Sequence, residues 1–261
     1  MSRILSEQII NIKKISKELC SVTIGSKYVS QDAVPGQFVN IKCCKGLEVL
    51  LRRPISICSV DKDKETFDIV FQLKGRGTEL LSEKIVGDSV DFIGPLGNSF
   101  NISSKYRRIA VVGGGIGIFP LLYLLKETPD AHRHAYLGFR SQENAVLIDE
   151  FQAESEKLSI STDDGSMGYK GVITESLKKD INDEKFDIIY TCGPMPMIKE
   201  VAKISAQGGI KCQVSLEQRM GCGIGACLVC ACKIGKPDNW EYKRVCKDGP
   251  VFWSDEVIFD D

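Results

Sequence analysis

Four cysteines near the C-terminus limit the possible folds of this chain more than any other feature of its sequence. From Met220 the sequence reads Met-Gly-Cys-Gly-Ile-Gly-Ala-Cys-Leu-Val-Cys, and another cysteine follows at position 246. Cys222, Cys227 and Cys230 therefore have the spacing Cys-x4-Cys-x2-Cys, and fifteen residues separate Cys230 from Cys246. Glycine allows positive φ angles, so backbone N–H groups can point at these sulfurs from a loop that contains Gly221, Gly223 and Gly225.

This spacing is typical of the ligands of a plant-type [2Fe–2S] cluster, in which two irons take four thiolates. A structural zinc site usually has cysteine pairs at some distance from each other, and buried unreactive thiols are a third interpretation. We predict a [2Fe–2S] cluster bound by Cys222, Cys227, Cys230 and Cys246. Cys232 could replace Cys230 or Cys246, but its alternating surroundings favour a small buried residue on a strand.

The length, charge and composition of the whole chain limit the function that such a cluster could have. Its 261 residues are enough for two domains and a small module, and a net charge of −1 gives no indication of a nucleic-acid partner. The first residues contain no apolar signal segment, and the longest apolar run, 109–125, is interrupted by glycines and Pro120. We therefore expect no membrane span. Eleven cysteines without a secretory signal indicate a reducing compartment, which predicts a cytoplasmic protein.

Residues 1–101 predict a first domain, an antiparallel β-barrel. Short β-like runs with turn residues between them favour this fold, and they are residues 20–24, 38–41, 55–60, 67–71 and 89–93. Arg53 and Ser56 flank Pro54 on a segment that we expect to be an edge strand, because proline cannot donate to a ladder. Thr78 is the expected N-cap of a short helix whose first N–H groups suit a phosphate. Each feature alone also fits a purely structural role.

Residues 102–215 predict a second domain, a doubly wound parallel sheet. Expected strands alternate with expected helices, the strands being 108–112, 135–138, 158–161, 187–190 and 210–214 and the helices being near 117–127, 145–157, 171–180 and 195–207. In such a fold the ligand crevice lies at the carboxyl ends of the strands. Residues 216–261 form the third predicted unit, the small cysteine-rich module.

Glycines follow the first and fourth expected strands of this sheet. The first strand ends in Gly113, Gly114, Gly115 and Gly117, which departs from the common dinucleotide motif because Ile118 stands at its last position. A backbone that must approach a pyrophosphate explains these glycines, and close packing of strand and helix is the alternative. The fourth strand ends in Cys192-Gly193-Pro194. There Cys192 would face the crevice, although a core thiol is the more common role.

The third strand of the sheet ends in two adjacent carboxylates, Asp163 and Asp164. Carboxylates at this place suit a ribose diol and repel a 2′-phosphate, so we predict NAD rather than NADP, with Asp164 as the binding residue. Arg140, at the end of the second strand, weakens this preference.

In combination these segments resemble the ferredoxin–NADP reductase superfamily and, more closely, the electron-transfer subunit of NAD-dependent (type B) dihydroorotate dehydrogenase. The resemblance covers essentially the whole chain. It implies that FAD binds to the barrel, with the arginine of Arg53-Pro54-Ile55-Ser56 on the pyrophosphate and the serine near the flavin ring. It implies further FAD contacts from Val70, Phe71, Gln72, Gly77 and Thr78. It also implies pyridine-nucleotide binding by Gly113 to Gly117 and by Cys192, Gly193 and Pro194.

The resemblance further implies an electron relay. A partner subunit with FMN would oxidise dihydroorotate, in a heterotetramer of two copies of each chain, during UMP biosynthesis. Electrons would pass singly through the [2Fe–2S] cluster to FAD and then as hydride to NAD⁺. This chain would supply no catalytic residue for dihydroorotate oxidation, and we interpret its only histidines, His132 and His134, as structural. The partner surface, or an apolar cover over the cluster, would include Trp240, Phe252 and Trp253.

Three alternatives stay open on the sequence alone. One is the small subunit of an NADH-dependent ferredoxin:NADP oxidoreductase, in which we expect an aspartate where this chain has Cys222. A second is another flavin and iron–sulfur reductase component, such as that of an oxygenase. A third, of a different class, is a regulatory module that holds zinc and is not an enzyme.

Overall fold

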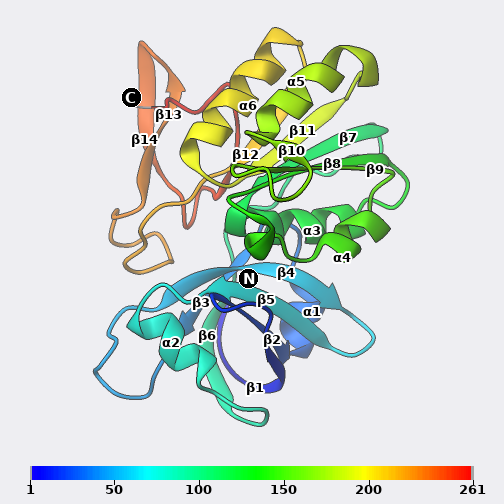
Figure 1. The fold of residues 1–261 in the computed structure, drawn as a ribbon. Helices are drawn as coiled ribbons and strands as arrows, with labels where there is room; N and C mark the ends of the chain where they lie inside the picture. The colour runs from blue at the N-terminus through cyan, green and yellow to red at the C-terminus, as the bar shows by residue number, and fades with distance from the viewer. Residues whose placement is uncertain (1, 260–261) are drawn as a thin grey trace.

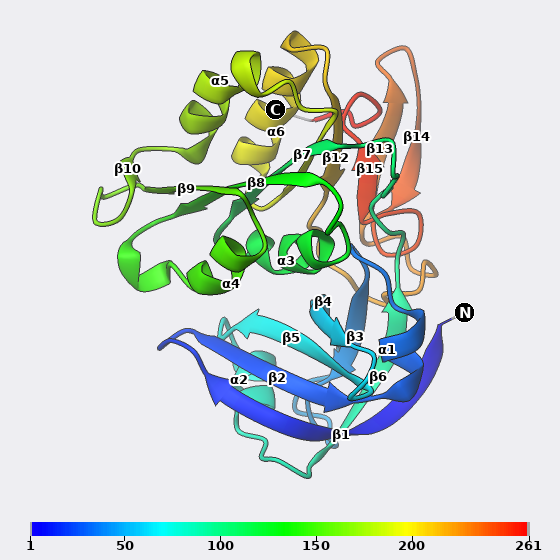
Figure 2. The same ribbon diagram turned by 90° about the vertical axis from the view of Figure 1, so that its right-hand side faces the viewer.

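The computed structural model describes residues 2–259. Residue 1 and residues 260–261, at the outer ends of the first and third predicted domains, lie outside the described residues. A closed β-barrel forms the lower half in Figure 1, and a sheet covered by helices forms the upper half. The last segment of the chain lies along one side of that sheet. Figure 2 shows the same two halves after a quarter turn, with the helix α3 between the sheet and the barrel.

The barrel is antiparallel, as predicted, and its six strands close in the order β1-β2-β5-β4-β3-β6. Alternate residues face a core that includes Val39, Ile41, Ile57, Ile69 and Phe92. The prediction of an edge strand at Arg53 was wrong, because β4 lies between β3 and β5. The barrel elements are β1 Arg3–Lys14, β2 Leu19–Gly25, α1 Lys27–Asp32, β3 Phe38–Lys42, β4 Arg53–Asp61, β5 Thr66–Gln72, α2 Arg76–Ser82 and β6 Ser89–Leu96.

The second half is the predicted doubly wound sheet, with strand order β10-β9-β8-β7-β11-β12-β15. Successive residues of β7 face opposite cores. Ile109 and Val111 pack with α3, whereas Ala110 and Val112 pack with α5 and α6. The elements are β7 Arg108–Gly114, η1 Gly115–Gly117, α3 Ile118–Lys126, β8 His132–Phe139, η2 Gln142–Asn144, α4 Ile148–Ala153, β9 Lys157–Thr162, β10 Tyr169–Lys170, α5 Ile173–Glu184, β11 Ile188–Cys192, α6 Met195–Gln207 and β12 Lys211–Ser215.

The strand order reverses between β7 and β11. From β7 the chain winds outward through β8 and β9, then returns to the other side of β7 for β11 and β12. The two strands run parallel, with Gly113 opposite Cys192. The loops that follow them therefore leave the same edge of the sheet side by side, which is the usual ligand position in this class of fold.

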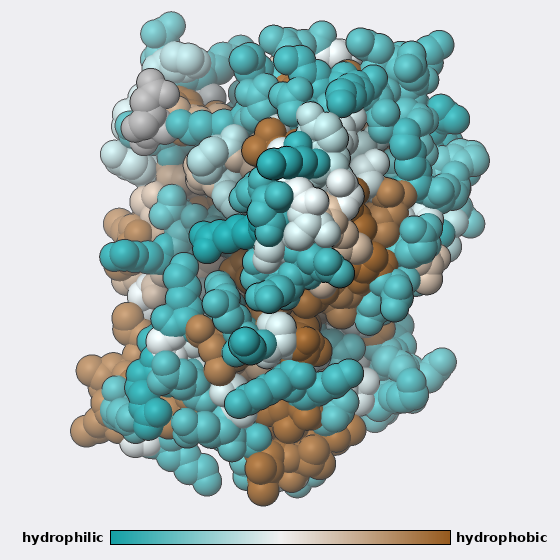
Figure 3. Space-filling view, in the orientation of Figure 1, coloured by the Kyte–Doolittle hydropathy of each residue, from teal (hydrophilic) through white to brown (hydrophobic). Residues whose placement is uncertain are grey.

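The C-terminal segment returns to the sheet, which local sequence patterns did not predict. After the cysteine loop, β13 Ala231–Lys236 and β14 Asn239–Arg244 form an antiparallel hairpin. The short strand β15 Val251–Trp253 then pairs antiparallel with β12. Apolar side chains of the cysteine loop stay exposed, among them Ile224, Leu228 and Val229. Figure 3 shows brown atoms at the left side of the molecule.

Several contacts join the barrel to the rest of the molecule. The hydroxyl of the buried Tyr123 on α3 donates to the Ala33 carbonyl at 2.8 Å. Asn98 bonds through its backbone and side chain to the Gly249 and Asp248 carbonyls, both at 2.6 Å. Asn40 of β3 donates to the cysteine loop. Among residues 2–259, no helix has both the length and the apolar character needed to cross a bilayer.

Candidate functional site

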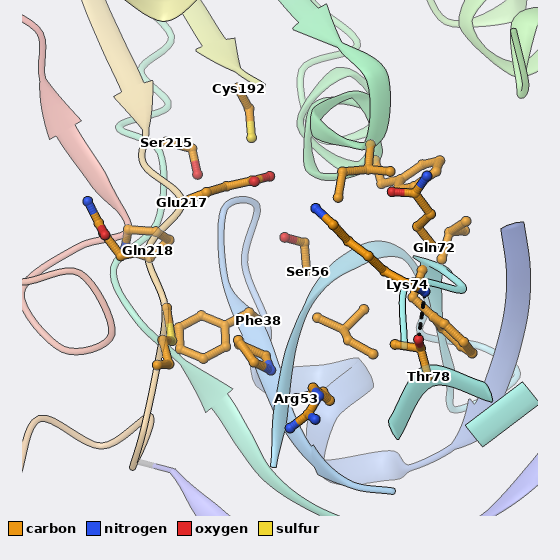
Figure 4. Close-up of a pocket in the computed structure, with 18 of the residues that line it drawn as sticks. Phe38, Arg53, Ser56, Gln72, Lys74, Thr78, Cys192, Ser215, Glu217 and Gln218 are labelled. Atoms are coloured by element: carbon orange, nitrogen blue, oxygen red, sulfur yellow. Dashed lines mark hydrogen bonds between the residues drawn. The ribbon is translucent and has the colours of Figure 1, made fainter. Parts of the chain in front are cut away.

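A cavity of about 440 Å³ lies where the barrel, the sheet and the C-terminal segment meet. The sheet contributes the carboxyl ends of β11 and β12 and the start of α3, so the cavity is beside the point where the strand order reverses. Figure 4 shows the side chains that surround it. Its lining residues are Phe38, Arg53, Pro54, Ile55, Ser56, Val70, Phe71, Gln72, Lys74, Gly75, Thr78, Ile116, Phe119, Cys192, Ser215, Leu216, Glu217, Gln218, Met220 and Pro250.

The cavity enters the barrel wall because β4 and β5 separate there. Pairing between these strands covers residues 57–61 of β4 and 66–69 of β5. Residues 53–56 pair with β3 instead, and residues 70–72 pair with β2. The gap brings together seven of the predicted flavin-binding residues, which are Arg53, Pro54, Ile55, Ser56, Val70, Phe71 and Gln72.

Arg53 lies against the first turn of α2. A Cβ atom on Gly77 would be 3.0 Å from the Arg53 Nε atom, so a glycine at this position makes room for the guanidinium. The prediction that Thr78 caps the helix was wrong, because α2 begins earlier, with Gly75 as its N-cap. The Thr78 hydroxyl instead accepts a hydrogen bond from the Lys74 N–H at 2.9 Å (Figure 4) and another from the Gly75 N–H at 3.3 Å. Thr78 therefore orders the turn that carries Lys74.

The glycines at the end of β7 and in η1 are explained mainly by packing inside the protein. A Cβ atom on Gly117 would be 2.4 Å from the Cys192 carbonyl oxygen, and one on Gly114 would be 2.8 Å from Pro194. Gly193 has a φ angle of +149°, and a Cβ atom on it would be 2.9 Å from the Gly114 nitrogen. The two loops at the sheet edge are thus packed directly on each other. Close packing, the alternative interpretation from the sequence, accounts for most of these glycines.

Gly115 is different from its neighbours. It has a φ angle of +54°, and a Cβ atom on it would meet no atom within 4 Å. The next residue, Ile116, is partly exposed and lines the cavity, as does Phe119 at the start of α3. Gly115 is therefore the position of this loop where a left-handed backbone faces open space that a dinucleotide phosphate could use.

Cys192 lies at the inner end of the cavity. Figure 4 shows its sulfur on the cavity side, near Ser215 and Glu217. Burial raises the pKa of this thiol to about 12, so it is neutral at physiological pH. Cys192 therefore presents a small neutral surface to a ligand, and it is both a core thiol and a cavity residue.

Two charged residues of the cavity were missed by the sequence analysis. Glu217 lies two residues after the end of β12 and Lys74 lies two residues after the end of β5, and both side chains lie along the cavity (Figure 4). Glu217 is accessible to solvent in the cavity but enclosed by its walls, and this enclosure raises the pKa of the carboxyl while Lys74 acts to lower it. The sequence signal that could have found both residues is their position shortly after a strand, which was also the basis for predicting Asp164.

Asp164 lies on the exposed loop after β9, two strands away from β7. The Ser166 hydroxyl and N–H both donate to its Oδ1, at 2.6 Å and 2.9 Å, and these bonds lower the pKa of the Asp164 carboxyl. The Asp164 N–H donates to the Arg140 carbonyl at 3.3 Å, so the carboxylate and a cation share this edge of the sheet. Asp164 does not line the cavity and would contact a different part of a dinucleotide.

The histidines lie away from the cavity. His132 and His134 stand at the first residues of β8, at the opposite edge of the sheet from its ligand-facing end. His132 pairs with Glu156 at 2.8 Å, and burial lowers the pKa of His134. These placements agree with a structural role.

The cysteine loop directs backbone N–H groups at its sulfurs. The Ile224 and Ala226 N–H groups donate to the Cys222 sulfur at 3.5 Å and 3.2 Å. The Cys222 N–H donates to the Cys227 sulfur at 3.3 Å, the Cys246 N–H to the Cys230 sulfur at 3.4 Å, and the Gly225 N–H to the Cys246 sulfur at 3.1 Å. One network therefore includes all four predicted ligands, and such bonds stabilise thiolates.

This network fits an iron–sulfur cluster in its chemistry. Burial acts against the Cys222 thiolate, but the N–H groups that face it lower its pKa to about 6. Cys232 lies on β13, where burial raises its pKa to about 11 and its side chain packs against the core. Within residues 2–259, no three His, Cys, Asp or Glu side chains are placed to hold a metal ion. The fit therefore depends on the N–H network and on the type of donor.

The three aromatic residues predicted at a partner surface differ in how far they are exposed. Phe252 is buried on β15, and Trp253 packs against the core beside α3. Phe252 packs in the same core as Cys230 and Cys246, which agrees with the alternative of an apolar cover and excludes it from an open contact surface. Trp253 is partly exposed, and its role in a contact stays a prediction. Trp240 is 41% exposed on the β13–β14 hairpin and stacks edge-on with Tyr242.

Comparison with solved structures gives the class of the protein. A structure of the NADH-dependent reduced ferredoxin-NADP oxidoreductase matches with a TM-score of 0.86 and 32% identity, over 97% of this chain and 89% of that one. A ferredoxin NADP⁺ reductase from Neisseria gonorrhoeae, with bound FAD and NADP, matches in fold, with a TM-score of 0.67 and 19% identity over 79% of this chain and 92% of that one. Fold and site together define an oxidoreductase of the ferredoxin–NADP reductase type with an added iron–sulfur module.

Sequence comparisons give the family. The model of the iron–sulfur cluster binding domain of dihydroorotate dehydrogenase B matches residues 217–258, and that of the oxidoreductase NAD-binding domain matches residues 111–203. The electron transfer subunit of dihydroorotate dehydrogenase B (NAD(+)) from Caldanaerobacter subterraneus subsp. tengcongensis is 39% identical over 98% of both chains. The same subunit from Desulforamulus reducens is 37% identical over the full length of both. The chain belongs to the family of dihydroorotate dehydrogenase B electron transfer subunits.

Proposed function

We propose that this chain binds FAD in its central cavity and a [2Fe–2S] cluster on Cys222, Cys227, Cys230 and Cys246. In this proposal it carries electrons from the FMN of a catalytic partner subunit to NAD⁺. One observation carries the proposal: the same cavity is bounded by the predicted flavin segments, by Cys192 of the predicted nicotinamide loop and by Met220, two residues before Cys222. The three predicted binding segments therefore converge on one volume.

The chain's own residues would have distinct tasks. Arg53 would pair with the flavin pyrophosphate, for which a guanidinium offers two parallel hydrogen bonds. The gap between β4 and β5 would admit the flavin ring beside Ser56, with Val70, Phe71 and Gln72 on the other side. A bound flavin supplies the exchange between single-electron and hydride transfer that NAD⁺ requires. Gly77 and Thr78 would support this site through Arg53 and through the turn before α2.

The pyridine nucleotide would bind across the sheet edge. The loops at Gly113–Gly117 and Cys192–Pro194 would hold the phosphates and the nicotinamide, with Gly115 as the open position. Asp164 would accept hydrogen bonds from the adenosine ribose, which favours NAD over NADP. We also propose domain limits of 1–101, 102–215 and 216–261, with β15 returning from the third domain to the sheet of the second.

The catalytic partner would dock over the cysteine loop. The exposed apolar residues Ile224, Leu228 and Val229 surround the predicted ligands and support this location, as does the neighbouring β3–β4 loop, in which Leu47 is 85% and Leu50 is 77% exposed. Figure 3 shows apolar atoms along this side of the molecule. A complex with two copies of each chain remains part of the proposal.

The test uses the complex purified without oxygen together with the chain alone. The complex should contain FMN, FAD and two irons per copy of this chain, and it should reduce NAD⁺ when given dihydroorotate. The isolated chain should be coloured by flavin and cluster, and NADH should bleach the flavin and then the cluster. A chain that holds neither iron nor flavin, or that does not respond to NADH, would contradict the proposal.

A second function is favoured by the match to the NADH-dependent reduced ferredoxin-NADP oxidoreductase structure, at 32% identity. The complex purified without oxygen also distinguishes the two functions. If reduced ferredoxin and NADH together reduce NADP⁺ while dihydroorotate supports no reduction of NAD⁺, the second function holds and the first is excluded.

A further inference from the structure

On the outer face of β3, two alternate residues contact the two halves of the site. Phe38 and Asn40 point away from the barrel core, which is filled by Val39 and Ile41. Phe38 lines the central cavity. Asn40, one pleat further along, lies under the cysteine loop and is only 1% exposed. One short strand therefore contacts both the predicted flavin site and the predicted cluster site.

The Asn40 amide rests on the peptide unit that joins Cys222 to Gly223. Its Nδ2 atom donates to the Cys222 carbonyl oxygen at 3.1 Å. Gly223 has a φ angle of +73°, and a Cβ atom there would be 2.2 Å from the Asn40 Nδ2 atom. The contact therefore requires both the amide and the glycine. It fixes the backbone of Cys222, whose sulfur accepts the Ile224 and Ala226 N–H groups.

Packing alone does not explain an asparagine at this position. Its Oδ1 atom is buried and has no hydrogen-bond partner among the described residues. A buried amide with an unpaired oxygen is less favourable for folding than an apolar side chain of similar size. Within residues 2–259, the one hydrogen bond that the side chain makes is to the ligand-bearing peptide, which indicates a role in placing that peptide.

We infer that Asn40 is a positioning residue that holds the Cys222 end of the cluster loop against the flavin barrel. It thereby sets the distance and the hydrogen-bond environment between the two redox sites. This inference rests on the proposed function. A residue that orients a ligand from outside the metal site typically changes metal affinity or activity by about 10–100-fold when it is removed.

The test compares Asn40→Asp, which keeps the shape but replaces the donor, with Asn40→Leu. The matched control is Asn98→Leu, because Asn98 also donates from the barrel to a carbonyl of the C-terminal segment, at Asp248. Anaerobic stopped-flow absorbance separates flavin reduction by NADH from the later reduction of the cluster. Electron paramagnetic resonance of the reduced cluster reports its environment independently of any rate.

In both Asn40 variants we expect flavin content and flavin reduction to stay close to wild type. Transfer from flavin to cluster should fall by about 10-fold, and the resonance spectrum should shift. The control should change neither. Wild-type transfer with an unchanged spectrum in the Asn40 variants would overturn the inference, and so would an equal loss in Asn98→Leu. A wild-type protein without flavin or iron would instead overturn the proposed function on which the inference depends.

Discussion

Gly117 and the Cys192 carbonyl oxygen are in direct contact across the two loops at the ligand edge of the sheet. A methyl group on Gly117 would lie 2.4 Å from that oxygen, whereas one on Gly115 would meet no atom within 4 Å. The two glycines of one loop therefore have different tasks. Gly117 allows the two loops to pack against each other, and Gly115 allows a left-handed backbone next to open space.

The first prediction follows from this difference. Gly117→Ala forces the loops apart and should lower the free energy of unfolding by about 1–3 kcal/mol. Gly115→Ala should cost only about 1 kcal/mol, from its positive φ angle, and should act mainly by raising the KM for NADH. Chemical unfolding and NADH-dependent flavin reduction measure these two effects. Equal stability of the two variants would show that the loop contact is unimportant.

A second prediction concerns the choice of ligands. Cys222→Ser should lose the cluster and keep the flavin, since the Cys222 sulfur is the acceptor of two N–H groups of the loop. Cys232→Ser is the matched control and should keep both, because Cys232 packs against the core on β13. Iron, sulfide and flavin are counted for each protein. Loss of iron in Cys232→Ser would mean that the ligand set is wrong.

Arg53 should be needed for flavin binding. Arg53→Ala removes the cation beside the gap in the barrel wall and should weaken FAD binding by about 10-fold or more. Arg53→Lys should restore only part of this, since an ammonium cannot make the paired bonds. Arg76→Ala, which removes a neighbouring exposed cation, is the control and should retain flavin. Equal flavin loss in Arg76→Ala would point to general damage at α2.

Asp164 should determine the choice of nucleotide. Asp164→Asn should raise the KM for NADH by about 10-fold and reduce the preference over NADPH, because the hydrogen-bond acceptor and the repulsive charge are both weakened. Asp163→Asn changes the adjacent exposed carboxylate and should have a smaller effect. Steady-state rates with both nucleotides give the comparison. A larger effect at Asp163 would transfer the ribose contact to that residue.

Glu217 should make stability depend on pH. Its pKa is raised above the unfolded value by enclosure in the cavity. The folded state then binds more protons than the unfolded state between those two pKa values, so stability falls as pH rises through that interval. Glu217→Gln should therefore gain stability relative to wild type as the pH rises from below the unfolded pKa to above the folded pKa of Glu217, by a small amount because solvent in the cavity screens the charge. Unfolding curves that stay parallel across this range would refute the assignment.

Local patterns predicted the barrel and the parallel sheet because both depend on alternation and on turn residues near in sequence. The strand β15 was missed, since three residues pair with a strand 36 or more positions earlier and carry no signal of their own. The same reason explains why β4 was taken for an edge strand. Proline at 54 excludes a hydrogen bond on one side, but only the closed barrel shows that the strands separate there.

The candidate site was predictable where a motif lies within a few residues. The cysteine loop, the arginine of β4 and the glycines after β7 were all visible in this way. Glu217, Lys74 and Asn40 were not, because single polar residues carry no pattern until distant segments are brought together. The glycines show a further limit of sequence motifs: most of them pack against protein, and their contact with a ligand stays a prediction.

Both ends of the cysteine segment are strands of one sheet, since β12 leads into it and β15 returns from it to lie beside β12. The segment is thus inserted between two neighbouring strands and is anchored to the sheet at both of its ends. The folded state would then fix the distance between the proposed flavin and cluster sites, and electron transfer between them would not require movement of the cluster module. Cutting the chain after β12 would also uncover a sheet edge, which invites association between molecules.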